Sequence, residues 1–375
     1  MTPHIEGLST QVCSVPSCVS RLQLVVETQM ITKSTDTNRQ ILMATNGRLL
    51  KHIWICTLGP LTIFLIYLEC AWDLVSSDVP APVSSSSARS PWRDPGPYHV
   101  AYPRNYKFIM DDTPTCKTTT PFLVLMVPVA PSNVAARDTI RKTWGNEKVV
   151  LGQLIETIFV LGLPGGADAE QQQEKLKQEN LQHRDLIQSN FKDSYHNLTI
   201  KTLVMLEWLD AHCHKTSYVL KIDSDMFLHV QNLVKLLLDP GTAKQNYMSG
   251  LVWWHSPVLR NPFNKFYMPR NVVAELEYPP YPLGMAYVMS LDLPAKILAV
   301  SPQIRPIFIE DAYLGMCLKL LGVSPSDPPE DSMFVVAPTH PLSNCSLSHV
   351  IAVTTTSVLQ MSSYWLRSRT PEAEC

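Results

Sequence analysis

The chain has 375 residues, of which 45% are hydrophobic and 17% charged, a composition typical of a folded protein with a sizeable core. Its 31 basic and 33 acidic side chains give a formal net charge of −2, and they form no lysine or arginine run. Because binding to nucleic-acid phosphates needs a concentrated basic face, we exclude nucleic acid as a partner.

An uncharged apolar segment, Ile53–Leu68, follows a polar N-terminal stretch. At a rise of about 1.5 Å per residue, a helix over this segment would be roughly 24 Å long. Glu69–Trp72 would extend it towards the thickness of a thin membrane. Arg48 and Lys51 precede the segment and Asp73 follows it, so the positive-inside rule places the N-terminus in the cytosol and the rest in a lumen.

This pattern divides the chain into four parts. We expect a cytoplasmic tail over 1–52, a transmembrane signal anchor over 53–72, a Ser/Pro-rich luminal stem over 73–115 and a luminal globular domain over 116–370. The stem is rich in serine and proline and cannot bury enough apolar surface to fold by itself. A cleaved signal peptide and a core helix interrupted at Gly59 and Pro60 are the alternatives to the anchor.

The cysteines after the apolar segment are Cys116, Cys213, Cys317, Cys345 and Cys375. In an oxidising lumen most of them should pair, and their odd number leaves at least one free or bridging two chains. The alternative is that Cys213 and Cys317 are buried as small hydrophobic residues. The sequence has no Cys-x-x-Cys pair, which argues against a zinc knuckle.

Strand and helix patterns alternate through the compact part. Continuous apolar runs predict buried strands at 121–130, 154–162 and 218–222. Helices are predicted at 132–144 with Ser132 as its N-cap, and at 170–188, 198–213 and 230–238. This alternation predicts an α/β fold with a mixed, mostly parallel sheet covered by helices on both faces. Ligands of such sheets bind beyond the carboxyl ends of the strands.

Asp223, Ser224 and Asp225 directly follow the predicted strand at 218–222. In an extended segment residues i and i+2 point the same way, so both carboxylates would leave the sheet edge together. Two hard oxygen ligands suit Mn²⁺ or Mg²⁺ bridging a diphosphate. The alternative is an acidic turn that only caps the next helix.

A second acidic pair, Glu310 and Asp311, lies in the first turn of a predicted helix that Gly322 ends. The helix dipole favours an ionised carboxylate there, so Asp311 could accept a proton from a hydroxyl as a general base. The alternative is that the pair only caps the helix.

Ordered signatures give the chain a resemblance to a known family. The segments that carry it are R137-D-T-I-R-K-T-W-G145, DSYHNLTIKT at 193–202, KIDSDMF at 221–227, FYMP at 266–269, EYPPYPLGMAYVMS at 277–290 and IEDAYLGMCLKLLG at 309–322. Together they resemble the β1,3-galactosyltransferases, type II membrane enzymes of the Golgi, over roughly 121–365.

The resemblance implies a GT-A type nucleotide-sugar-binding fold, a UDP-sugar donor, Mn²⁺ as cofactor, and inversion at the anomeric carbon by single displacement. Asp225 and Asp223 would hold the metal and Asp311 would be the general base. The donor-binding candidates are Asp223, Ser224, Arg137, Arg141 and Lys201. For the three basic residues the alternative is a surface or core salt bridge. The acceptor-binding candidates are Tyr281, Glu310 and Trp253.

The Lys-x-Asp-Ser-Asp core resembles the galactosyl branch of the family. We therefore expect galactose to move from UDP-galactose to the 3-hydroxyl of a GlcNAc- or GalNAc-type acceptor on glycoprotein or glycolipid glycans. The implied place is the Golgi membrane, with the catalytic domain luminal; a homo-oligomer is left open. The alternatives are N-acetylglucosaminyl or N-acetylgalactosaminyl transfer, and a catalytically silent Golgi protein.

The chain departs from the family pattern at Pro282, where relatives usually carry cysteine, and at Ala286, where they carry glycine. Thr354 stands where relatives carry a metal-binding histidine. Water or a neighbour such as His349 or His340 would take the place of that ligand, or the metal affinity would be lower. Two glycosylation sequons, at Asn197 and Asn344, are compatible with a luminal domain.

Overall fold

The computed structural model describes residues 98, 100, 102 and 104–369, which belong to one compact unit. The expected tail over 1–52, the anchor over 53–72 and most of the stem lie outside these residues. Within the described ranges, no helix combines the length and the apolar character needed to cross a bilayer.

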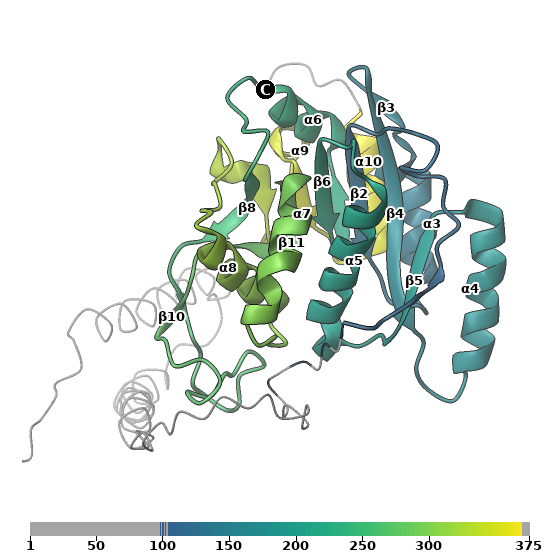
Figure 1. Cartoon of the computed structure of the whole chain (residues 1–375). Helices are drawn as coiled ribbons and strands as arrows, with labels where there is room; N and C mark the ends of the chain where they lie inside the picture. Colours follow the sequence, from purple (N-terminus) through teal and green to yellow (C-terminus); the bar gives the residue numbers. More distant parts are fainter. Residues whose placement is uncertain (1–97, 99, 101, 103, 370–375) are drawn as a thin grey trace, which may run out of the picture. The chain divides into compact units, whose positions relative to one another are not determined.

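A twisted β-sheet forms the centre of the domain (Figure 1). Its order is β1 (Phe108–Met110), β5 (Leu186–Lys192), β4 (Gln153–Leu163), β2 (Leu123–Pro128), β6 (Tyr218–Ile222), β11 (Tyr281–Ser290) and β8 (Met248–Trp253), with β3 (Val149–Val150) paired to β4. The pairs β5–β4, β4–β2 and β2–β6 are parallel, whereas β1–β5, β6–β11 and β11–β8 are antiparallel. The expectation of a mixed sheet is thus confirmed, but the sheet is parallel only at its centre and not over most of its width.

Helices cover both faces of this sheet because its strands carry apolar side chains on both sides. Along β2, Val124 and Met126 pack into one core, and Leu123, Leu125 and Val127 pack into the other. The first core is covered by α5 (Leu198–His212), α7 (Asp292–Val300) and α8 (Glu310–Leu321). The second is covered by α3 (Val134–Lys142), α4 (Ala169–His183), α6 (Val230–Leu238), α9 (Asn344–His349) and α10 (Val358–Arg367).

A second small sheet brings the C-terminal part of the chain to the end of β6. Its order is β12 (Phe334–Val335), β13 (Ala352–Thr354) and β7 (Met226–Leu228), and Thr354 pairs with Met226. A third sheet pairs β9 (Ser256–Pro257) with β10 (Glu277–Tyr278). Short 3₁₀ helices are η1 (Trp144–Asn146), η2 (Tyr195–Asn197), η3 (Ser301–Gln303) and η4 (Asp331–Met333).

Two of the predicted elements were wrong in detail. The N-cap of α3 is Asn133, whose side chain accepts a hydrogen bond from the Ala136 N–H, and not Ser132. The helix predicted over 170–188 ends at His183, because Arg184 adopts a left-handed conformation, and β5 begins at Leu186. The predicted strand at 218–222 and the helix at 230–238 match β6 and α6.

The end of the expected stem packs onto the folded domain. Val100 and Tyr102 are buried, and the Val100 N–H donates to the Pro306 carbonyl at 2.9 Å. β1 extends the sheet by pairing with β5. The boundary predicted at residue 116 is therefore too late, because apolar and aromatic residues before it find partners in the core.

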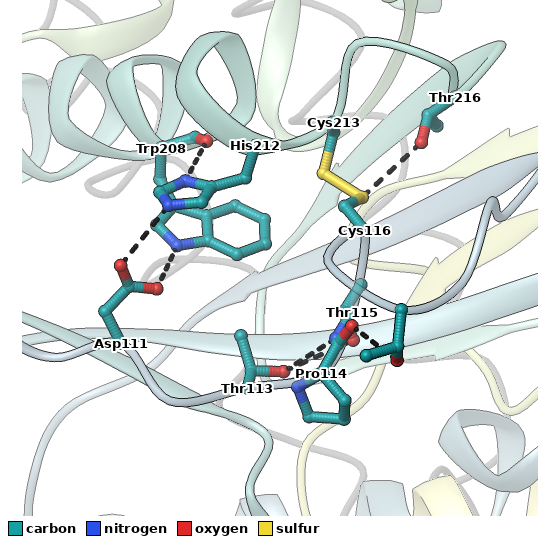
Figure 2. Close-up of a disulfide and its surroundings, with 10 residues drawn as sticks. Asp111, Thr113, Pro114, Thr115, Cys116, Trp208, His212, Cys213 and Thr216 are labelled. Carbon is teal, nitrogen blue, oxygen red and sulfur yellow. Dashed lines mark hydrogen bonds and ion pairs between the residues drawn. A yellow bond between two sulfur atoms is a disulfide. The ribbon is translucent and has the colours of Figure 1, made fainter.

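Cys116 and Cys213 form a disulfide that joins the segment after β1 to the end of α5 (Figure 2). Beside it, Asp111 accepts a hydrogen bond of 2.6 Å from the Trp208 indole N–H. Cys317 and Cys345 are free, and Cys375 lies outside the described residues, so the expectation that most cysteines pair is not met here. The alternative of a buried small hydrophobic residue holds for Cys317 and fails for Cys213.

Candidate active site

A cleft of about 920 Å³ lies beyond the carboxyl ends of β2, β4, β5 and β6. Residues that directly follow these strands line it, as expected for the central, parallel part of the sheet. Asp223, Ser224 and Asp225 line one part, and Glu310 and Asp311 at the start of α8 line another.

The segment from Asp223 to Asp225 is a turn between β6 and β7, since the Met226 N–H donates to the Asp223 carbonyl at 3.2 Å. The extended geometry inferred from the sequence was therefore wrong. Both carboxylates nevertheless line the same cleft. The Asp225 carbonyl accepts hydrogen bonds from the N–H and the hydroxyl of Thr355, which fixes the turn to the C-terminal segment.

A buried lysine lies beneath these acids. The Lys221 ammonium donates to Asp223 Oδ1 at 2.7 Å and to the Gly284 carbonyl, and its Nζ is 4.0 Å from Glu310 Oε2. Burial opposes its charge, but the Asp223, Glu310 and Asp311 carboxylates outweigh burial and raise the pKa of Lys221. Lys221 thus remains a cation at the base of the cleft.

The Asp225 carboxylate is open to the cleft and, apart from its own backbone N–H, has no hydrogen-bond or ion-pair partner within the described part of the chain. Surrounding protein and the neighbouring Asp223 raise the pKa of Asp225. Two adjacent acids of this kind suit a hard divalent cation, which can keep water as its remaining ligands. Among residues 104–369, no group of three or more His, Cys, Asp or Glu side chains is arranged to hold a metal.

Asp311 is held by backbone donors. Its Oδ2 accepts from the Gly284 N–H at 2.9 Å and its Oδ1 from the Ala312 N–H at 2.9 Å. Burial raises the pKa of Asp311, although these N–H groups and Lys221 oppose that rise. A fixed carboxylate with a raised pKa beside a cleft is suited to receive a proton.

On the donor side, Lys201 and Ser224 line the cleft as expected. The Lys201 ammonium is 2.7 Å from Asp193 Oδ2 and donates to the Val129 carbonyl at 3.1 Å. Burial lowers the pKa of Lys201 in spite of the Asp193 carboxylate.

Arg137 and Arg141 do not line this cleft, which corrects their assignment as donor-binding residues. Arg137 is fully buried and bonds both Glu179 oxygens at 2.7 Å. Arg141 pairs with Glu179 at 2.7 Å and Asp185 at 2.8 Å. Both arginines therefore join α3 to α4, and Arg141 also joins α3 to the segment that follows α4.

Of the acceptor candidates, Trp253 lines the cleft with 48% of its surface exposed. Tyr281 is not among the lining residues, because its hydroxyl turns to Ser256 at 2.8 Å in the interior. Glu310 borders the cleft but is only 7% exposed, and its carboxylate receives hydrogen bonds from Thr202 and Tyr287. Tyr281 and Glu310 are therefore not placed as acceptor ligands.

Sequence reasoning missed several residues of the cleft. Tyr195 lines the cleft and is 49% exposed. Partial burial raises the pKa of Tyr195, and the nearby Asp311 carboxylate raises it further. Phe266 adds a second half-exposed ring, and Asp193 is the partner of Lys201. Tyr195 and Asp193 lie in the family signature at 193–202, which was the available signal.

The structure shows where the residues that depart from the family pattern lie relative to the cleft. Thr354 lies on β13 opposite Met226, the residue after Asp225, and its hydroxyl accepts from the Ala337 N–H at 2.7 Å. His349 ends α9 and contacts the Cys345 carbonyl; neither it nor His340 lines the cleft. Ala286 is buried in the core opposite Ile222, where the added methyl is accommodated.

The sequon asparagines are half-buried at helix starts. The Asn197 amide donates to the Lys192 carbonyl at 2.8 Å, and the Asn344 carbonyl oxygen accepts from Arg367 at 2.6 Å. Glycosylation at either position stays a prediction.

Comparison with known proteins shows which family this chain is similar to. A family model described as galactosyltransferase matches residues 135–329. The chain is 37% identical over 272 residues to β1,3-galactosyltransferase 2 of Pongo abelii, covering 71% of this chain and 63% of that protein. It is also 37% identical over 224 residues to β1,3-galactosyltransferase 1 of Mus musculus, covering 60% and 68%.

The chain thus spans less than two thirds of the first of these relatives. Among solved structures, the apo WbbM bifunctional glycosyltransferase matches with 10% identity and a TM-score of 0.39, over 68% of this chain and 50% of the other. The segment matched by the family model includes the acidic turn after β6 and the first turn of α8. The chain therefore belongs to the β1,3-galactosyltransferase family.

Proposed function

We propose that the protein is an inverting β1,3-galactosyltransferase that moves galactose from UDP-galactose to the 3-hydroxyl of a GlcNAc- or GalNAc-type acceptor. The observation that carries this proposal is the shared cleft, because Asp223, Asp225 and Asp311 line it from two distant parts of the chain. Family membership supports galactosyl transfer.

Asp225 and Asp223 are the residues that would hold Mn²⁺, since the Asp225 carboxylate bonds only its own backbone N–H and Asp223 has one oxygen beyond its bond to Lys221. When bound, the ion supplies Lewis-acid stabilisation of the negative charge on the departing UDP. Lys221 places a further cation at the donor end of the cleft, and Lys201 lines the same end beside Asp193. Ser224 completes the donor-binding group.

Asp311 is the proposed general base. The acceptor oxygen forms a bond to the anomeric carbon from one side while the bond to UDP breaks on the other, so the configuration inverts. The proton of the acceptor hydroxyl passes to Asp311, whose orientation is fixed by Gly284 and Ala312. Trp253, with Tyr195 and Phe266, offers aromatic surface against which the acceptor sugar can lie.

We also propose that the domain lies in the Golgi lumen, behind a single type II anchor. The Cys116–Cys213 disulfide supports an oxidising compartment. The sequons at Asn197 and Asn344 agree with such a location.

The test is a donor and acceptor screen with the purified full-length protein in detergent and Mn²⁺. UDP-galactose, UDP-GlcNAc and UDP-GalNAc are each offered with GlcNAc- and GalNAc-terminated acceptors. We expect the highest turnover with UDP-galactose and a β1,3-linked product. Preference for another donor contradicts the galactose assignment, and UDP binding without any transfer would support the silent protein that Thr354 motivates.

Replacing the base separates binding from chemistry. We expect Asp311→Asn to lower kcat by about 10²- to 10⁴-fold, the usual contribution of a general base, with UDP affinity nearly unchanged. Asp331→Asn, an exposed acid outside the cleft, is the matched control. Equal loss of transfer and UDP binding in Asp311→Asn would contradict the assignment.

A further inference from the structure

Glu310 has an environment unlike that of a substrate ligand. It borders the cleft but is 7% exposed. Its Oε1 accepts from the Thr202 hydroxyl of α5 at 2.9 Å and from the Tyr287 hydroxyl of β11 at 2.7 Å. Tyr287 is fully buried and is not among the cleft-lining residues. One of the two hydrogen bonds to Glu310 Oε1 therefore comes from the protein interior.

The other oxygen of Glu310 faces the base of the cleft. Oε2 is 4.0 Å from the Lys221 ammonium. It also lies against Gly284 so closely that a Cβ at residue 284 would be 2.8 Å from it. The carboxylate thus contacts residues of α5, β6 and β11 from the first turn of α8.

Gly284 and Lys221 connect this carboxylate to both acidic parts of the cleft. The Gly284 N–H donates to Asp311 Oδ2 at 2.9 Å, and its carbonyl accepts from Lys221. Lys221 in turn donates to Asp223 Oδ1 at 2.7 Å. A shift of Glu310 would therefore reach Asp311 through the backbone of one residue, Gly284, and Asp223 through the Lys221 ammonium.

We infer that Glu310 is a positioning residue that holds Gly284 and Lys221, and through them fixes Asp311 and Asp223 for transfer. This inference rests on the proposed function and adds a residue to it. A buried carboxylate is costly unless it is paired and hydrogen-bonded. Here the two hydroxyl donors and Lys221 meet that requirement, which leaves Glu310 little capacity to bind a sugar.

Tyr287→Phe tests the inference without changing a cleft-lining side chain. It removes one of the hydrogen bonds that orient Glu310, and we expect kcat to fall about tenfold, as for the loss of one hydrogen bond that is felt in the transition state. The KM values for UDP-galactose and acceptor and the affinity for UDP should stay within about twofold of wild type.

The matched control is Tyr313→Phe, which removes a buried hydroxyl on α8 that donates to the Ser301 carbonyl at 3.1 Å. Both variants should lose similar thermal stability, and only Tyr287→Phe should lose kcat. Glu310→Gln keeps the shape and an acceptor oxygen but removes the charge that faces Lys221. We expect its kcat to fall further than that of Tyr287→Phe.

The outcomes separate the two proposals. If the wild type transfers galactose and both Tyr287→Phe and Glu310→Gln keep its kcat, the positioning role is wrong and the proposed function stands. A raised acceptor KM with unchanged kcat in Glu310→Gln would return Glu310 to acceptor binding and overturn the inference. A wild type that transfers no sugar from any of the three donors contradicts the proposed function itself. In that case the positioning role of Glu310 in transfer is also wrong.

Discussion

At Gly284 the backbone lies against two acids of the cleft. A Cβ there would lie 2.8 Å from Glu310 Oε2 and 3.3 Å from Asp311 Oδ2, closer than a side chain tolerates without movement. The requirement is therefore one of space and not of backbone conformation. A larger residue would displace the two carboxylates that the geometry aligns.

We expect Gly284→Ala to lower kcat by about 10²-fold, because a displacement of about 1 Å at the reacting groups costs that much. Overpacking of this kind should cost about 1–3 kcal/mol in the free energy of unfolding. The measurements are steady-state kinetics and denaturant unfolding. Gly165→Ala, which adds a methyl group elsewhere on the cleft wall with nothing within 4 Å of the new Cβ, is the comparison variant. Wild-type kcat in Gly284→Ala would show that the acids do not depend on this contact.

The pH dependence of transfer follows from Asp311. Burial raises the pKa of Asp311, against the opposing Gly284 and Ala312 N–H groups and Lys221, so it takes up its proton at a higher pH than an ordinary aspartate at about 3.9. A general base must be ionised, and we therefore expect kcat to fall with decreasing pH at a point above that value. The check is kcat from about pH 4 to 8 at saturating substrates and Mn²⁺. If kcat fell only at or below the pH of an ordinary aspartate pKa, about 3.9, the raised pKa of Asp311 would be contradicted.

Single residues were predictable from the sequence where a short motif fixes their place. Asp223, Asp225 and Asp311 line one cleft as their motifs indicated. Arg137 and Arg141 were misplaced because a basic residue near a motif does not reveal its partners. Those partners, Glu179 and Asp185, lie about 40 residues away in sequence, and only the packing of α3 on α4 brings them into contact.

At the scale of elements, the disulfide joins the segment after β1 to the C-terminal end of α5. It closes a loop with a sequence separation of 97 residues. In the chain-entropy model a loop of about 100 residues corresponds to about 4.7 kcal/mol of stabilisation. We therefore expect Cys116→Ser to lower the free energy of unfolding by roughly 4–5 kcal/mol.

Chemical denaturation of the wild type and Cys116→Ser, under non-reducing conditions, is the measurement. Cys345→Ser, which changes a free half-buried thiol, should leave the unfolding midpoint close to that of the wild type. Coincident midpoints for Cys116→Ser and the wild type would mean that the bridge adds little to the folded state.

Elements were predictable where a strongly apolar pattern is bounded by clear stop signals, as at β6 and α6. β5 was read as the end of a long polar helix because Gln188 and Ser189, although polar, are buried in it. The Gln188 amide donates to the Gly162 carbonyl at 2.8 Å and to the Gln173 side chain at 2.9 Å. Such tertiary hydrogen bonds allow a polar strand to be buried, and a local pattern does not contain them.

At the scale of the whole molecule, the cleft depends on segments that the chain brings together from far apart. β7 follows the acidic turn directly, and β13 pairs with it from the C-terminal part of the domain. This pairing sets Thr354 beside the turn, and Thr355 holds the Asp225 carbonyl. The family model ends at residue 329, so this contact lies beyond the matched segment.

The position of Thr354 leads to a prediction about metal dependence. Relatives with histidine at this position would have an imidazole beside Asp225, whereas threonine offers only a hydroxyl that already accepts from the Ala337 N–H. A nitrogen ligand suits Mn²⁺ better than a neutral hydroxyl. We therefore expect Thr354→His to lower the Mn²⁺ concentration for half-maximal transfer by about tenfold, within the range that changes around metal sites produce. At saturating Mn²⁺ its kcat should equal that of the wild type.

Thr354→Val is the control, because it keeps the side-chain shape and removes the hydroxyl without adding a ligand. Its Mn²⁺ requirement should match the wild type if the hydroxyl is not a ligand. An Mn²⁺ titration of transfer for the three proteins decides the matter. An unchanged titration in Thr354→His would mean that β13 does not bring residue 354 within reach of the ion, and that Asp223 and Asp225 hold it without help from this strand.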